Sequence, residues 1–180
     1  MKSLIRKELR TFFSTLMGYV VVCAFLLLTG LFLWVFPGEW NVLDNGQANL
    51  DALFIWAPWV LMFLVPAITM RSFSEEMGRG TMELLLTKPI TEAQIVLAKF
   101  TGAFSVLILS LVPTLVFLPI IGFLGQPQWN FDAGAIYGSY LGLLLLGSTF
   151  TALGVFASSL TANPLVAFLV TSVTLVFGFV

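Results

Sequence analysis

The chain has 180 residues, of which 59% are hydrophobic and 9% charged, with a net charge of −1 and a mean hydropathy of +1.02. A soluble globular domain carries about 25% charged residues, so this composition excludes that class and indicates a membrane protein. The charges are segregated along the chain rather than gathered into a basic surface, and no nucleic-acid partner is expected.

The basic residues occupy two stretches. Four lie in the first ten residues and four lie between Arg71 and Lys99, and the rest of the chain has no Lys or Arg. Because Lys and Arg resist translocation, both stretches are expected in the cytoplasm. This orientation places the N-terminus and residues 71–99 inside.

Residues 1–14 have the spacing of an amphipathic helix. Ile5, Leu9, Phe12 and Leu16 recur at steps of four, three and four, while the basic residues take other positions. The pattern predicts an interfacial helix that lies on the inner leaflet with its basic side toward lipid phosphates. An ordinary positively charged flank of the first span is the alternative.

Five apolar stretches follow, each near or above the roughly 17 to 25 residues that a helix needs to cross a bilayer. They are residues 16–36, 53–70, 100–123, 133–160 and 164–180. The sequence therefore predicts an all-α polytopic membrane protein with five transmembrane helices. The chain stops at Val180 inside an apolar run, which favours a C-terminally truncated domain that lacks one more helix.

Tryptophan gives an independent check on this topology. Trp residues prefer the membrane interface, and all of them map to the outer ends or outer loops of the predicted spans. They are Trp34, Trp40, Trp56, Trp59 and Trp129.

Proline and glycine mark features inside the spans. Pro66 lies in the second span, and Pro113 and Pro119 lie in the third, where each removes a backbone hydrogen bond and is a candidate hinge. Prolines are also common in membrane helices without any such role.

In the fourth span, glycines recur at steps of four and predict a smooth stripe for close helix packing. They are Gly134, Gly138 and Gly142. We expect them to pack within the chain, with a dimer interface as the alternative.

The chain offers little for catalysis or for binding a metal or nucleotide. It has no histidine, its single cysteine, Cys23, lies in an apolar run, and no charged residue lies deep in a span. A disulfide framework, a metal site and acid–base catalysis are therefore not expected. No phosphate-binding loop of the GxxxxGK[ST] type is present, so we expect no cofactor on this chain.

The cytoplasmic loop at 71–99 is divided by Gly78, Gly80 and Pro89 into three short helical pieces. The first piece presents Glu75 and Glu76. The second begins at Thr81 and carries Glu83, Leu84 and Leu85 on barely two turns, too few to be stable without a packing partner. That partner is either the protein and membrane themselves or a groove in a soluble subunit.

The third piece opens with Thr91 and Gln94, which have the spacing of a capping box. This motif stands directly before the apolar run of the third span. It therefore predicts where the third helical piece of the loop begins.

The run from Glu75 to Thr91, with its Gly-Thr-x-Glu-Leu-Leu-Leu core between spans two and three, resembles the type-2 ABC transporter permeases. More narrowly, it resembles the permease subunit associated with gliding motility. The resemblance covers essentially the whole chain and implies a six-span fold, of which this chain supplies five, in the bacterial inner membrane. In that family the short loop helix is the coupling helix that seats on the ATPase subunit.

Carried over to this sequence, the resemblance implies ATPase-coupling residues in the loop and at its ends, namely Glu75, Glu76, Gly80, Thr81, Glu83, Leu84, Leu85 and Pro89. It also implies a separate ABC ATPase subunit that holds ATP and Mg, so that this chain is not itself an enzyme. One chain is too small to enclose a conduit, and a second permease protomer, identical or paralogous, is expected.

The predicted function is a permease subunit that couples ATP hydrolysis to export or to mechanical transmission toward a periplasmic partner. Two other classes stay open. An ion-coupled secondary transporter would usually bury charged coupling groups, which the spans lack. A non-transporting membrane assembly factor would tolerate replacement of Glu83 and Leu84.

Overall fold

The computed structural model describes residues 2–44, 49–82, 91–125 and 127–179. Within these ranges the chain is helical and contains no strand. The helices are α1 (Lys2–Phe13), α2 (Leu16–Trp34), α3 (Asp51–Thr69), α4 (Ser74–Gly78), α6 (Glu92–Leu111), η1 (Val112–Val116), α7 (Phe117–Leu124), α8 (Ala133–Ser159) and α9 (Pro164–Phe179). The predicted all-α fold is confirmed for this part of the chain.

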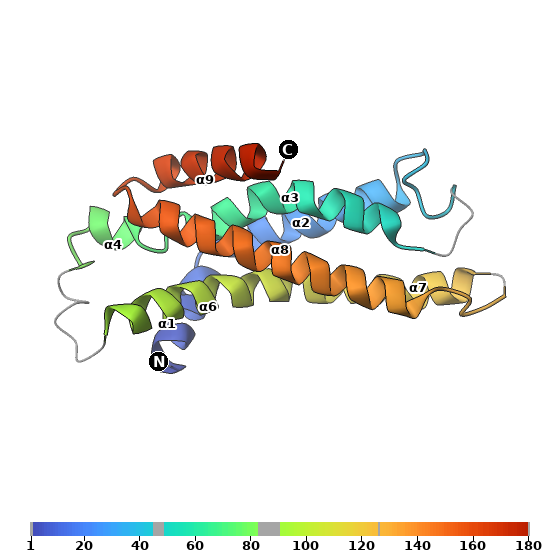
Figure 1. The fold of residues 1–180 in the computed structure, drawn as a ribbon, viewed down its shortest axis with the longest axis horizontal. Coiled ribbons are helices and arrows are strands. Elements are labelled where there is room, and N and C mark those ends of the chain that lie inside the picture. Colours follow the sequence, from blue (N-terminus) through green and yellow to red (C-terminus); the bar gives the residue numbers. More distant parts are fainter. Residues whose placement is uncertain (1, 45–48, 83–90, 126, 180) are drawn as a thin grey trace.

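Four helical segments are long and apolar enough to cross a membrane. They span Leu16–Trp34, Asp51–Gly78, Glu92–Leu124 and Ala133–Ser159. Figure 1 shows them running side by side along the long axis of the molecule. The helix at the fifth predicted span, α9, has 16 residues and is shorter than these. The fifth crossing and the cytoplasmic N-terminus therefore stay predictions.

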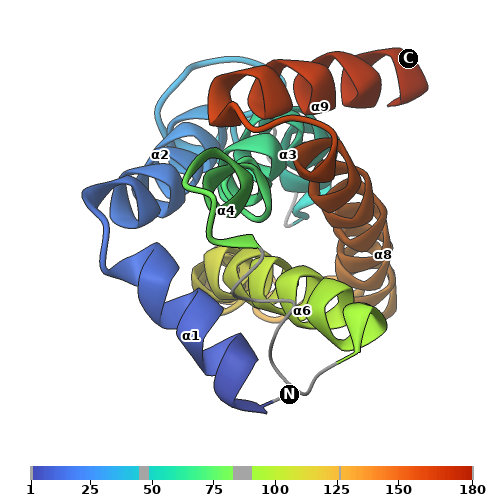
Figure 2. The same cartoon turned by 90° about the vertical axis from the view of Figure 1, so that its left-hand side faces the viewer.

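Helix α3 lies at the centre of the bundle, between α2, α8 and α9 (Figure 2). More than half of its crossing segment is buried, and Leu53, Ala57 and Leu61 are fully enclosed. Because lipid supplies no hydrophobic drive between helices, small residues that permit close approach become important. Gly154 of α8 is such a residue, since a Cβ there would collide with the side chain of Thr69 at the end of α3.

The helix of the third predicted span is interrupted. It begins at Glu92 and is α-helical to Leu111, then tightens into the 3-10 turn η1 before α7. Pro113 lies in this turn, and its missing N–H explains why the α-helical bonding pattern fails there. Pro119 lies within α7 and Pro66 within α3. Whether these prolines act as hinges stays a prediction.

The glycine stripe of α8 lies on a surface that is exposed among the described residues. Gly134, Gly138 and Gly142 are exposed, and a Cβ on Gly138 or Gly142 would meet no described atom within 4 Å. The packing role of this stripe, within the chain or at a dimer interface, therefore stays a prediction. The glycines of α8 that do pack closely are Gly147, against Leu107, and Gly154. Helix periodicity identifies a stripe but does not tell which side of the helix meets a neighbour.

The two ends of the bundle differ in composition. The basic residues that the structure describes lie at the end that carries α1, α4 and the start of α6, and we call it the charged end (Figure 1). At the opposite end, the tryptophan end, Trp34 contacts Phe117 and Trp40 contacts Trp56 at ring-centroid distances of 5.8 and 6.2 Å. The described basic residues and these three tryptophans therefore lie at opposite ends of the bundle.

Candidate functional site

Lys99 is the most deeply buried of the described charged residues at the charged end. It lies on α6 directly after the four apolar residues 95–98, and its side chain is only 3% exposed. Its Nζ atom lies 3.1 Å from Glu8 Oε1 of α1 and 2.9 Å from Glu76 Oε2 of α4. The same ammonium lies 5.6 Å from the centroid of the Phe73 ring. A single cation thus connects three helices that are distant in the sequence.

A fourth charge completes this cluster. Lys7 of α1 lies 3.3 Å from Glu76 Oε1 and is about half exposed, so Glu76 is shared between two cations. We call Lys7, Glu8, Glu76 and Lys99 the charged junction. Its two cations balance its two carboxylates. Because removing one partner of a buried ion pair leaves an uncompensated charge, the arrangement makes the positions of α1, α4 and α6 interdependent.

A glycine permits the close approach of α1 to α6. Gly102 lies on α6 one turn after Lys99, and a Cβ there would lie 2.8 Å from the Cβ of Glu8. The apolar side of α1, with Leu9 and Phe12, packs against the core of the bundle. The N-terminal helix predicted over 1–14 is therefore formed, but its apolar side faces the protein's own helices. Its interfacial position in a membrane stays a prediction.

The start of α4 is held by α8. The buried hydroxyl oxygen of Ser158 accepts hydrogen bonds from the backbone N–H groups of Phe73, at 2.8 Å, and Ser74, at 3.3 Å. These N–H groups stand at the beginning of a helix, where no backbone partner is available. The Ser74 hydroxyl in turn donates to the carbonyl oxygen of Met70. A side chain near the end of α8 thus fixes the angle at which the chain leaves α3.

The end of α4 has a defined stop. Gly80 adopts a left-handed φ of +67°, its N–H donates to the Met77 carbonyl, and the Thr81 N–H donates to the Glu76 carbonyl. This pair of bonds is the Schellman arrangement, which favours glycine at that place because glycine has no Cβ. Gly80 therefore ends α4. The predicted break at this glycine is confirmed.

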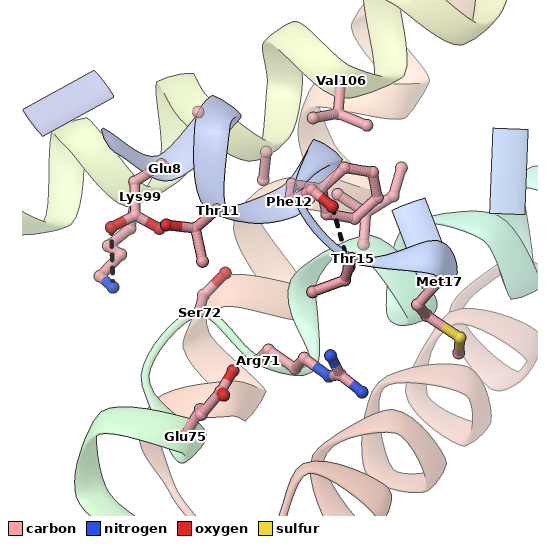
Figure 3. A pocket seen from close by; sticks show the side chains of 13 residues that line it. Glu8, Thr11, Phe12, Thr15, Met17, Arg71, Ser72, Glu75, Lys99 and Val106 are labelled. Carbon is pink, nitrogen blue, oxygen red and sulfur yellow. Dashed lines mark hydrogen bonds and ion pairs between the residues drawn. The ribbon is translucent and has the colours of Figure 1, made fainter. Parts of the chain in front are cut away.

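A small cavity of about 100 Å³, lined by both apolar and charged side chains, lies between α1, the end of α3 and α6 (Figure 3). Glu8 and Lys99 face each other on one side of it, Arg71 and Ser72 come from the α3–α4 connection, and Glu75 comes from α4. The cavity can hold a few water molecules, since a water needs only about 10 to 15 Å³ of such space and several polar partners. Water there would allow the ion pairs to rearrange without exposing a bare charge.

The predicted coupling residues fall into two groups. Glu75 pairs with Arg79 at 2.6 Å on the surface of α4, and Glu76 belongs to the charged junction. Thr81 donates its hydroxyl to the Glu76 carbonyl at 3.3 Å. The remaining members, Glu83, Leu84, Leu85 and Pro89, lie outside the described residues.

The capping box that opens α6 is confirmed. The Thr91 hydroxyl accepts from the Gln94 N–H, and the Gln94 side chain accepts from the Thr91 N–H.

Sequence reasoning missed Lys99, Glu8 and Ser158 as members of the site. A weak signal existed for Lys99, because it follows the apolar residues Ile95 to Ala98 and a cation in such a position needs a partner. Nothing in the sequence identifies Glu8 as that partner. Among the residues that the structure describes, no three His, Cys, Asp or Glu side chains gather as a metal site would require.

The hydroxyl groups of the last two helices mostly bond within their own helix. Of the nine Ser and Thr residues in α8 and α9, six donate their hydroxyl to a carbonyl three or four residues earlier: Ser148, Thr149, Thr151, Ser159, Thr171 and Thr174. Ser172 is buried and has no hydrogen-bond partner among the described residues. These hydroxyls therefore do not form a polar pathway within the described chain.

An all-helical chain with several apolar crossings and a charged helical junction at one end belongs to the class of multi-pass membrane proteins. More specifically, the family model for the ABC-2 family transporter protein matches residues 3–180, and the chain belongs to that family. The family comprises membrane components that are not themselves catalytic and normally pair with an ABC ATPase subunit. No curated protein and no solved structure matches the chain.

Proposed function

We propose that this chain is the permease subunit of an ABC transporter in the bacterial inner membrane and that residues 71–99 form its contact with the ATPase subunit. The main support is the charged junction together with the Ser158 contact. Through them, α4 is fixed to α1 by Lys7, to α6 by Lys99 and to α8 by Ser158. A force applied to α4 would therefore reach three helices of the bundle at once.

In this proposal the energy comes from the partner. ATP and Mg bind to two ATPase subunits, and their closure displaces the loop as a rigid body. Helix α3 leads into α4 through the turn at residues 70–73, so the displacement tilts α3 and, through Lys99, α6. The 3-10 turn at Pro113 would allow the angle between α6 and α7 to change when α6 tilts.

The proposed assembly has two permease protomers, identical or paralogous, with the N-terminus in the cytoplasm and α9 as a fifth crossing. No ion pair lies in the apolar middle of the described spans, and most of the hydroxyls of α8 and α9 bond within their own helix. A hydrophobic or lipid-like cargo is consistent with these spans. So is mechanical transmission to a periplasmic partner, as in the gliding-motility permeases that the sequence resembles.

The proposal is tested by retention of the ATPase. We would co-express the chain with a tagged ABC ATPase subunit from the same organism and measure co-purification and stimulated ATP hydrolysis. Glu83→Ala and Leu84→Asp should abolish both. Leu43→Asp is the matched control, since Leu43 is an exposed leucine of the 37–44 segment at the tryptophan end, and it should change neither.

Two outcomes would overturn this function. Full ATPase retention by both loop variants would favour an assembly factor. Gradient-driven transport by the chain alone in vesicles, without ATP, would favour a secondary transporter. Orientation is tested separately with Thr81→Cys in a Cys23→Ser background, which should react with an impermeant maleimide only from the cytoplasmic side.

A further inference from the structure

The outer surface of α1 carries cations that the charged junction does not fully use. Arg6, Lys7, Arg10, Thr11 and Ser14 line a shallow hollow of about 460 Å³. Arg6, Arg10 and Ser14 follow one another at steps of four, which places them on one face of the helix. Neither arginine forms an ion pair with the part of the chain that the structure describes. The hollow therefore has two uncompensated guanidinium groups.

We propose that this hollow is a binding site for the headgroup of an anionic phospholipid. Guanidinium groups match phosphate geometry through paired N–H donors and are the usual side chains for this task. The Thr11 hydroxyl forms no hydrogen bond with the described residues and is exposed, so it can donate to a phosphate oxygen. The Ser14 hydroxyl donates to the Thr11 carbonyl at 2.8 Å, and this bond holds the Ser14 oxygen at the edge of the hollow.

The position of the hollow favours a lipid over free phosphate. Helix α2, which is long and apolar enough to cross the membrane, begins at Leu16, two residues after Ser14. Leu16, Tyr19 and Val20 share a face and are 82%, 57% and 50% exposed. A phosphate held by Arg6 and Arg10 would therefore lie at headgroup level, with its acyl chains beside this exposed apolar surface.

The proposal does not depend on an ATPase subunit, because its readout is lipid binding by the purified chain alone. We would titrate the detergent-solubilised chain with phosphatidylglycerol, with phosphatidylcholine and with inorganic phosphate, and count bound molecules by native mass spectrometry. Phosphatidylglycerol should bind about tenfold or more tightly than phosphatidylcholine. Each cation near an anionic headgroup contributes roughly fivefold, so Arg6→Gln with Arg10→Gln should remove most of that preference.

Two further variants complete the design. Arg6→Lys with Arg10→Lys keeps the charge and should retain most of the preference. Arg79→Gln is the matched control, because Arg79 is an exposed arginine at the same end that is already paired with Glu75, and it should leave lipid binding unchanged. Lys7 is left intact, since its removal would disturb the charged junction.

Three results would overturn the proposal. One is equal binding of the two phospholipids by the native chain. Another is an undiminished preference for phosphatidylglycerol in the double glutamine variant, with circular dichroism showing that its helices are intact. The third is binding of inorganic phosphate that displaces phosphatidylglycerol at equal concentration, which would make the hollow a site for free anions.

Discussion

The charged end and the tryptophan end hold their helices together by different means. At the charged end, ion pairs and side-chain caps join α1, α4, α6 and α8, and each contact needs a specific partner. At the tryptophan end, aromatic rings pack on one another, as in the stack of Phe32 on Trp56 with centroids 4.3 Å apart. Within the described ranges no ion pair joins helices there. The comparison indicates that single substitutions lower the free energy of unfolding more at the charged end than at the tryptophan end.

The largest effect is expected from Lys99→Met. This change leaves Glu8 and Glu76 facing each other beside a buried apolar side chain, and breaking a buried pair in this way costs about 3 to 5 kcal/mol. Denaturant unfolding of the detergent-solubilised chain would measure the loss. Adding Glu8→Gln and Glu76→Gln should recover part of it, because the repulsion is then gone.

The control for Lys99 is Arg79→Gln, which breaks a surface pair at the same end and should cost at most about 0.5 kcal/mol. If Lys99→Met were as mild as Arg79→Gln, the charged junction would not stabilise the fold. The distinction between the two ends would then fail.

The next prediction compares Gly→Ala changes at two glycines of α8. Gly154→Ala places a methyl group against Thr69, a stiff, buried side chain whose hydroxyl is bonded to the Val65 carbonyl, and overpacking of this kind costs about 1 to 3 kcal/mol. Gly138→Ala adds a methyl group where no described atom lies within 4 Å. It should stabilise the helix by up to about 1 kcal/mol in unfolding measurements, unless a second protomer covers this face.

A smaller effect is expected from Ser158→Ala. The change removes the acceptor for two backbone N–H groups at the start of α4, and leaving such buried donors unpaired costs about 1 to 2 kcal/mol. Hydrogen exchange at Phe73 and Ser74 should accelerate. The neighbouring Ser159→Ala is the control, because that hydroxyl is exposed and bonds only to its own helix at Phe156. Equal exchange in both variants would mean that α8 does not hold α4.

Local sequence signals were sufficient for the helices but not for the charged end. The apolar runs located four helices that are long and apolar enough to cross a membrane, and Thr91 with Gln94 marked the start of α6, because both features depend on residues close together in the chain. The partnership of Lys99 with Glu8 depends instead on how α1 folds back on α6. No spacing within either segment encodes that contact.

The glycines of α8 are a second case in which a sequence pattern did not identify the residues that make close contacts. The regular stripe at Gly134, Gly138 and Gly142 is the more conspicuous pattern, yet the close contacts are made by Gly147 and Gly154. Which face of a helix is buried is decided by the neighbours in space. In a membrane helix that is apolar all round, hydrophobic periodicity does not reveal that face.

The smallest effect, and the most direct test of the tryptophan end, is Trp56→Phe. The indole of Trp56 stacks on Phe32 and contacts Trp40 edge-on, but its buried N–H has no hydrogen-bond partner among the described residues. The change loses some packing and at the same time removes an unpaired donor, so the two contributions oppose each other. We expect a net loss of about 1 kcal/mol or less in the unfolding assay used for Lys99→Met.

The control is Trp40→Phe, at a more exposed ring of the same cluster, which should lower the stability by a similarly small amount. A loss of about 3 kcal/mol from Trp56→Phe would mean that the aromatic contacts are as specific as the ion pairs, and that the two ends do not differ in kind.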